Sequence, residues 1–201
     1  PHCPGFDFSG VVVEVGELAQ DSFKVGDEVF GTNHKTNGTM ADYVVARKNW
    51  LVKKPAQITH VEAAAIPLAA LTAYQALLKV NVGEGAKVLI LGGSSACGLF
   101  ALQIAKNLGA AFVATTSSSV ELCQSLGADL VINYREEFWS ERLFAIPENG
   151  AAAGVGAGEE KAAPEDGTKG KSEEEAGDGV QPPPGPYVIV DCVGGEGAWL
   201  A

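Results

Sequence analysis

The fold is decided by residues 87–98, which read Lys87-Val88-Leu89-Ile90-Leu91-Gly92-Gly93-Ser94-Ser95-Ala96-Cys97-Gly98. The opening residues of this stretch form a short apolar run, which is typical of a buried strand. The glycines and serines that follow indicate a tight turn. Leu99 to Leu108 then has the composition of a helix, which Gly109 ends. A strand, a glycine-rich turn and a helix in this order predict the start of a βαβ unit.

The residues after this unit repeat the same alternation. The predicted strands are Phe112–Thr115, Leu130–Ile132 and Tyr187–Asp191, and the predicted helix is Val120–Leu126, ended by Gly127. Strands that alternate with helices indicate a parallel sheet covered on both faces. We therefore expect an α/β fold, with a Rossmann-type doubly wound sheet over residues 87–201.

The first 56 residues have a different pattern, with short apolar runs separated by glycines. The predicted strands are Val11–Val15, Glu28–Phe30 and Ala41–Val45. This spacing predicts a small β domain over residues 1–56. Residues 57–86 form the connection, where Thr59 and Glu62 make a capping box and Pro67 bends or splits the helical stretch that runs to Leu78.

Residues 148–186 interrupt the α/β pattern with a segment rich in glycine, alanine, glutamate and proline. It holds nine acidic residues against three lysines, a net charge of −6. Such a segment buries too little apolar surface to offset the entropy of ordering it. We predict that it is a disordered insert within the sheet domain.

Composition excludes several classes of partner. A net charge of −11 and a pI near 4.7 argue against a nucleic-acid partner. No window holds the run of about 18 apolar residues that a membrane span needs. The cysteines are widely scattered, which favours reduced thiols and an intracellular location over a disulfide framework; they are Cys3, Cys97, Cys123 and Cys192.

The turn after the first strand of the predicted sheet indicates a phosphate site. Gly93 and Gly98 match the first and last glycines of GxGxxG, and Ser95 stands at the middle position. Small residues allow backbone N–H groups and a helix N-terminus to approach a pyrophosphate. The alternative is an ordinary glycine-rich turn without a ligand.

The end of the second strand favours NADPH over NADH. Sites that prefer NAD place Asp or Glu there, whereas residues 115–119 read Thr115-Thr116-Ser117-Ser118-Ser119. Hydroxyl groups can donate to a 2′-phosphate, which a carboxylate would repel. Arg135 could supply a cation, although it could equally be a solvated charge, and the serines could form a surface loop without a ligand.

These residues belong to a larger set of motifs that resembles the medium-chain dehydrogenase/reductase superfamily, in its zinc-free quinone oxidoreductase branch. Pro4–Gly10 resembles PGxDxxG and Val25–Val29 resembles VGDxV. Further matches are Gly38–Tyr43 with GxxAEY, Thr72–Tyr74 with TA(Y/W), Leu126–Asp129 and Ile132–Tyr134 with LGAD…I(N/D)Y, and Asp191–Gly195 with the DxVGG strand end of the reticulon-4-interacting-protein-like subgroup.

The resemblance implies an incomplete GroES-like β domain followed by an incomplete Rossmann domain, with NADPH in the cleft between them. The family's opening strands and active-site loop would precede Pro1, and its last strands would follow Ala201. By the same analogy, Thr72, Val193 and Gly194 border the nicotinamide end. The pyrophosphate would be lined by Gly93, Ser94, Ser95, Ala96, Cys97 and Gly98, and the 2′-phosphate by Thr116, Ser117, Ser118 and Tyr134.

The implied activity is transfer of a hydride from NADPH to a quinone or an α,β-unsaturated carbonyl. Phe6 stands where zinc alcohol dehydrogenases have a metal-ligating histidine, so catalytic zinc is not expected. No catalytic residue can be named, since Asn33, His34 and Thr36 lack a decisive partner. The alternatives are a catalytically silent NADPH-binding scaffold and a zinc alcohol dehydrogenase. A homodimer is possible, and whether this chain alone is active is left open.

Overall fold

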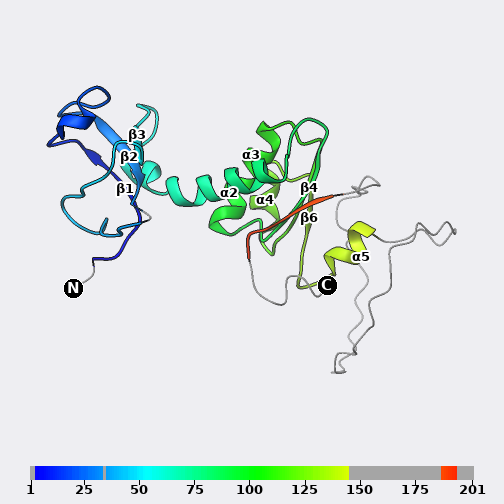
Figure 1. The fold of residues 1–201 in the computed structure, drawn as a ribbon. Coiled ribbons are helices and arrows are strands. Elements are labelled where there is room, and N and C mark those ends of the chain that lie inside the picture. Colours follow the sequence, from blue (N-terminus) through cyan, green and yellow to red (C-terminus); the bar gives the residue numbers. More distant parts are fainter. Residues whose placement is uncertain (1–2, 34, 145–186, 194–201) are drawn as a thin grey trace, which may run out of the picture.

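The chain forms a small antiparallel sheet and a larger parallel sheet, joined by helices (Figure 1). The computed structural model describes residues 3–33, 35–144 and 187–193. The predicted disordered insert, 148–186, therefore lies outside the described residues, as does Gly194. Within the described residues, no helix combines the length and apolar character needed to cross a membrane.

The antiparallel sheet comprises strands β1 (Asp7–Val11), β2 (Glu28–Thr32) and β3 (Leu51–Lys53), in the order β1-β2-β3. A 3-10 helix, η1 (Glu17–Ala19), lies in the connection between β1 and β2. The Ser9 hydroxyl donates to the Val29 carbonyl at 3.0 Å and lies 2.7 Å from His60 Nδ1. This contact fixes the start of the helical connection against the sheet.

Two helices form that connection, α1 (His60–Ala64) and α2 (Pro67–Lys79). The predicted capping box at the start of α1 is confirmed, because Thr59 N–H donates to Glu62 Oε2 at 2.7 Å and Glu62 N–H donates to Thr59 Oγ1 at 3.2 Å. Pro67 was predicted to bend or split the helical stretch, and the structure shows that the stretch is split into two helices. Pro67 is the first residue of α2, a position where its missing N–H costs nothing.

The parallel sheet comprises β4 (Lys87–Leu91), β5 (Phe112–Thr116), β6 (Leu130–Ile132) and β7 (Val188–Asp191), in the order β6-β5-β4-β7. Helices α3 (Ala96–Asn107), α4 (Val120–Ser125) and α5 (Trp139–Phe144) alternate with these strands. The strands are parallel, and the strand order reverses at β4, because β5 and β6 lie on one side of β4 and β7 lies on the other. In open α/β sheets, ligands bind at the carboxyl ends of the strands at such a reversal.

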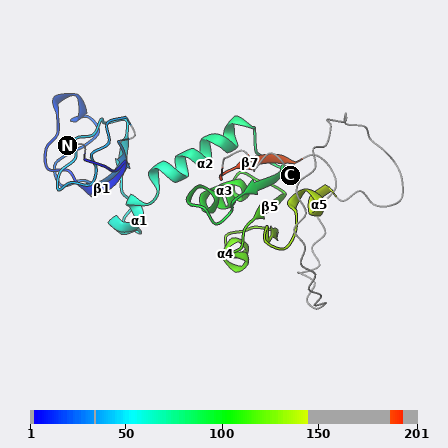
Figure 2. The same ribbon diagram turned by 90° about the horizontal axis from the view of Figure 1, so that it is seen from below.

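Strand β4 is buried on both faces, as its continuous apolar sequence predicts. Val88 and Ile90 pack in one core cluster with Leu77 of α2 and Leu102 of α3. Leu89 belongs to the cluster on the opposite face, which includes Leu130 and Leu143. Figure 2 shows α2 and α3 lying together on one side of the sheet. The expected α/β class and doubly wound sheet are thus observed.

Two predicted strands are wrong. The first strand is Asp7–Val11 and not Val11–Val15, because the partner strand β2 begins opposite Val11, at Glu28. Val13 is 62% exposed, so the run of valines continues past the sheet. Residues 41–45 form no strand, and within the described chain no strand lies beside them to complete a ladder.

Candidate dinucleotide site

The turn between β4 and α3 is held close to the sheet by its glycines. Gly92 has a φ of +79°, which favours glycine. A Cβ atom at Gly92 would collide with the Val193 side chain, and one at Gly93 would collide with the Thr115 hydroxyl. A Cβ atom at Gly98 would meet the Gly92 carbonyl oxygen. Larger residues at these three positions would push the turn and the start of α3 away from β4.

Two hydroxyl groups at the end of β5 hold this turn through hydrogen bonds. The Gly92 N–H donates to Thr116 Oγ1 at 2.9 Å, and the Ser117 hydroxyl donates to the Ser94 hydroxyl at 2.9 Å. Ser117 Oγ also accepts from the Ser119 N–H at 2.9 Å. Thr116 is 6% exposed and Ser117 is 1% exposed. These side chains therefore orient the turn, whereas Ser118, the next residue, is exposed.

Helix α3 begins directly after the turn. Ser95 caps the helix, and its hydroxyl accepts from the Gly98 N–H at 3.1 Å. Helix N-termini carry N–H groups without intrahelical partners and the positive end of the helix dipole, so they bind phosphate. The helix begins at Ala96, earlier than the predicted Leu99, since Ser95 supplies the cap. Ser94 and Ala96 are exposed there, and Cys97 is half-buried.

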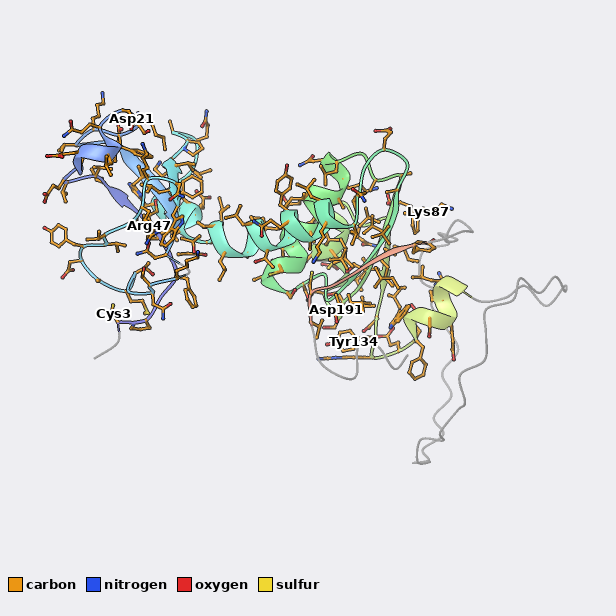
Figure 3. All side chains as sticks on the ribbon, viewed as in Figure 1. Cys3, Asp21, Arg47, Lys87, Tyr134 and Asp191 are labelled. Atoms are coloured by element: carbon orange, nitrogen blue, oxygen red, sulfur yellow. The ribbon has the colours of Figure 1, made fainter. Side chains whose placement is uncertain are left out.

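A second polar group forms where the chain leaves β6. Tyr134 is 58% exposed, and the Arg135 guanidinium lies 5.9 Å from the centre of its ring. A hydrogen bond with Ser118, followed by the charge and hydrogen bond of Arg135, lowers the pKa of the Tyr134 phenol. In Figure 3, Tyr134 and Asp191 lie at one end of the parallel sheet, and Lys87 lies at the other. The hydroxyl and guanidinium groups are thus at the carboxyl ends of the strands.

The remaining predicted residues meet at a cavity between α2 and β7. This cavity has a volume of about 200 Å³ and is lined by Thr72, Ala73, Ala76, Cys97, Val190, Asp191, Cys192 and Val193. The Thr72 hydroxyl donates to the Leu68 carbonyl of its own helix at 2.7 Å, which leaves its lone pairs as acceptors. The structure therefore brings Thr72, Cys97 and Val193 together.

A larger apolar cavity of about 680 Å³ lies on the other side of Thr72, between the antiparallel sheet and α2. Its walls include Trp50, just before β3, Leu51 of β3, and Leu68 and Leu71 of α2. Thr72 lines both cavities. A ligand in the smaller cavity can therefore come close to a molecule in the larger one at this residue.

Comparison with known proteins shows what these features belong to. Residues 1–56 match the alcohol dehydrogenase GroES-like domain family. The chain is 42% identical over 147 residues to 2-methylene-furan-3-one reductase of Solanum lycopersicum, and 39% identical over 147 residues to the chloroplastic NADPH-dependent alkenal/one oxidoreductase of Arabidopsis thaliana. Each alignment covers 68% of this chain and 38% of the relative.

A solved structure gives the same answer. The quinone oxidoreductase from Coxiella burnetii is similar with a TM-score of 0.64 and 36% identity, over 73% of this chain and 46% of that one. The chain is a quinone oxidoreductase-like member of the medium-chain dehydrogenase/reductase superfamily. It spans about two fifths of the length of the curated relatives it matches.

Phe6, which the resemblance matches to the position of a ligating histidine in the zinc alcohol dehydrogenases, is 43% exposed. The described residues contain no group of three or more histidine, cysteine or acidic side chains placed to hold a metal ion. His60 is the one histidine among the described residues, and its Nε2 lies 3.4 Å from Glu28 Oε1. Cys3 donates its thiol hydrogen to the Met40 carbonyl at 3.2 Å.

Some residues at the site were not predicted from the sequence, and other polar residues were given no role. Gly92 was not among the predicted cofactor contacts, although the double glycine was a signal that the turn starts there. Thr32 and Asn33 are buried, and Thr32 Oγ1 and Asn33 Oδ1 have no hydrogen-bond partner among the described residues. The Asn33 amide nitrogen donates to the Val45 carbonyl at 3.0 Å. Thr36 is exposed, and His34 lies outside the described residues.

Proposed function

We propose that the protein containing this chain transfers a hydride from NADPH to a quinone or an α,β-unsaturated carbonyl, without zinc. The observation that carries the proposal is the tightly packed glycine turn between β4 and α3, with Gly92, Gly93 and Gly98, beside the capped N-terminus of α3. The names of the relatives, an alkenal/one oxidoreductase and a furanone reductase, support the class of acceptor.

The shape and polarity of the site fit a dinucleotide. In this proposal a pyrophosphate binds at the glycine turn, against the first N–H groups of α3, with Ser94, Ser95, Ala96 and Cys97 around it. We place the nicotinamide end at the smaller cavity, beside Thr72 and Val193. This position puts it next to the large apolar cavity, where the acceptor would bind.

NADPH is preferred over NADH in this proposal because of the groups beyond β5 and β6. Ser118 and Tyr134 present hydroxyl groups, and Arg135 supplies the positive charge that a 2′-phosphate needs. The buried hydroxyls of Thr116 and Ser117 would act indirectly, by holding the turn and the Ser118 backbone in place. The residues at the end of β5 include no carboxylate to repel the phosphate.

Bound NADPH would supply the hydride, and the residues of this chain would supply orientation and exclusion of water. The apolar walls of the larger cavity favour a flat, hydrophobic acceptor over a charged one. Hydrogen bonds from hydroxyl or amide groups would then polarise its carbonyl in place of a metal.

We further propose that residues 1–56, 57–86 and 87–201 are the domain units, and that the protein is an intracellular homodimer.

The test uses the complete protein and follows the loss of NADPH absorbance with a panel of quinones and α,β-unsaturated ketones. Oxidation of NADPH that persists after chelation of metals supports the proposal. Binding of NADPH without turnover of any acceptor would instead show a silent binding protein. Alcohol oxidation that depends on added zinc would contradict the zinc-free mechanism, and failure to bind either nicotinamide cofactor would remove the proposal altogether.

A further inference from the structure

A buried hydroxyl group belongs to the wall of the large apolar cavity. Thr32 is the last residue of β2, is 6% exposed and lines this cavity. Its Oγ1 atom has no hydrogen-bond partner among the described residues. Most buried side-chain polar atoms in proteins are hydrogen-bonded, and an unpaired one costs stability. The Thr32 hydroxyl is therefore a group that a ligand in the cavity could satisfy.

The polar side chains nearest to Thr32 along the sheet have partners of their own. Asp7 stands directly opposite Thr32 in the ladder between β1 and β2, but both of its carboxylate oxygens accept from the Leu68 N–H. Ser9, two residues further along β1, donates its hydroxyl hydrogen to the Val29 carbonyl. Within the described chain, these contacts satisfy Asp7 and Ser9 and leave the Thr32 hydroxyl free.

The backbone at Thr32 is fixed, and its surroundings are apolar. The Thr32 N–H donates to the Trp50 carbonyl at 3.1 Å, which holds the end of β2 beside β3. Phe30 is two residues away on the same face of β2 and lines the same cavity, as does Leu51 of β3. A hydrogen bond is electrostatically stronger among apolar side chains than in water. A ligand atom that accepts from Thr32 would therefore be held firmly.

Asn33 provides a contrast that identifies the chemistry of the ligand. Asn33 Oδ1 also lacks a partner in the described part of the chain, but Asn33 is not one of the residues that line the cavity. Its side-chain nitrogen already donates to the Val45 carbonyl at 3.0 Å. The free Asn33 atom can only accept, whereas the Thr32 hydroxyl can donate. The cavity wall thus offers a donor, which suits a carbonyl oxygen.

We propose that the Thr32 hydroxyl anchors the carbonyl oxygen of the acceptor in the large cavity. Rotation about χ1 moves the hydroxyl between the staggered positions on Cβ and brings it to the ligand. It then donates to the carbonyl oxygen, while the hydrocarbon part of the ligand packs against the apolar wall. The part that Thr32 plays in the reaction rests on the proposed function, whereas its part in binding a ketone does not.

The same hydrogen bond would stabilise the charge that develops during reduction. Hydride addition forms a C–H bond at the β-carbon, and the π electrons shift so that the carbonyl oxygen becomes an enolate oxygen. A hydrogen bond from Thr32 strengthens as this negative charge grows. A proton from water then forms a C–H bond at the α-carbon, and the cofactor leaves as NADP+. Thr32 would thus be the donor that replaces a metal at the carbonyl.

The first experiment measures binding of 1-tetralone to the full chain by saturation-transfer NMR, without cofactor. Tetralin, which has nearly the same shape and no carbonyl, is titrated in parallel. Thr32→Val should raise the dissociation constant of 1-tetralone about fivefold and leave that of tetralin unchanged. Thr32→Ser keeps the hydroxyl and should bind 1-tetralone as the unaltered chain does. Thr36→Val, at an exposed threonine, is the matched control and should change neither affinity.

A second measurement separates a ligand anchor from a structural hydroxyl. Because the Thr32 hydroxyl makes no protein hydrogen bond in the described chain, Thr32→Val should leave the urea midpoint of unfolding unchanged or raise it. A lower midpoint would show that the hydroxyl has a structural partner and would overturn the proposal. So would an equal change in affinity for 1-tetralone and tetralin, or no binding of 1-tetralone to the unaltered chain.

The role in reduction is tested in the complete protein with an enone. Thr32→Val should lower kcat/KM about a hundredfold, and Thr36→Val should leave it unchanged. An unchanged kcat/KM in Thr32→Val would overturn this role. A complete protein that oxidises NADPH with no acceptor would count against the proposed function, and the titrations with 1-tetralone and tetralin would still decide whether Thr32 anchors a carbonyl.

Discussion

The N–H of Gly92 donates to the hydroxyl of Thr116 at 2.9 Å, so the last residue of β5 holds the first residue of the glycine turn. Gly92 needs this support because its φ of +79° turns the chain sharply away from β4. The neighbouring Gly93 N–H donates to the Thr116 carbonyl at 3.0 Å. One residue thus satisfies two successive donors of the turn.

Replacement of Thr116 by valine should destabilise the fold. Valine has nearly the shape of threonine, but it leaves the Gly92 N–H without its acceptor in a partly buried setting. We expect the free energy of unfolding to fall by about 1–3 kcal/mol, measured by urea denaturation. NADPH affinity should fall as well. Thr36→Val, on the exposed surface, should change the unfolding free energy by less than about 0.5 kcal/mol. Equal effects of the two substitutions would contradict the role given to Thr116.

Replacement of Gly93 by alanine should displace the turn. The new methyl group would collide with the Thr115 hydroxyl, which is buried and donates to the Ile90 carbonyl at 2.6 Å. We expect a cost of about 1–3 kcal/mol in unfolding free energy and a clear loss of NADPH binding in a fluorescence titration. Gly83→Ala is the matched control, because a Cβ there meets no atom within 4 Å. Unchanged NADPH binding by Gly93→Ala would show that the turn is not the phosphate site.

Much of this region could be predicted from the sequence, because local pattern and tertiary environment agree. The strand at Lys87–Leu91 is buried on both faces, so an uninterrupted apolar run is what its environment requires. The valines at 11–15 have the same local pattern, yet the chain opposite them turns at Gly26, which has a φ of +92°. Strand pairing is a long-range property that a run of β-branched residues does not encode.

The sequence also could not predict which way each serine hydroxyl points. Ser117 and Ser118 are adjacent and chemically identical, but Ser117 is buried against Ser94 and Ser118 is exposed. Which of them faces a ligand depends on how the end of β5 meets the turn after β4. Composition predicted a hydroxyl-rich site, and only the fold distinguishes the supporting hydroxyl from the accessible one.

Replacement of Asp7 by alanine should weaken the junction between the antiparallel sheet and α2. The Asp7 carboxylate oxygens lie 3.0 and 3.2 Å from the Leu68 N–H, which donates to them from the first turn of α2. A carboxylate at this end of a helix satisfies a free donor and complements the dipole. We expect a loss of about 0.5–2 kcal/mol in thermal or urea unfolding. Asp42→Ala, in an exposed loop, is the control and should have little effect; a comparable loss there would argue against a specific cap.

Replacement of Tyr134 by phenylalanine should reduce affinity for NADPH more than affinity for NADH. The phenol can donate to a 2′-phosphate, which NADH lacks. We expect about 1 kcal/mol of lost binding free energy, or about a fivefold weaker interaction, for NADPH alone. Arg135→Gln should have a larger effect of the same kind, since it removes a charge. Parallel titrations with both cofactors measure the ratio, and an equal loss for the two would contradict a 2′-phosphate site here.

The pH dependence of that preference follows from the lowered pKa of Tyr134. Ser118 and Arg135 stabilise the phenolate, so Tyr134 should lose its proton at a lower pH than an ordinary tyrosine. The phenol donates a hydrogen bond below its pKa, and the phenolate repels phosphate above it. NADPH affinity should therefore decline as the pH rises through this pKa, while NADH affinity changes less. In Arg135→Gln one cause of the shift is absent, so the tyrosinate absorbance of Tyr134, obtained by difference from Tyr134→Phe, should appear at higher pH. A midpoint that does not move in Arg135→Gln would show that the guanidinium does not act on the phenol.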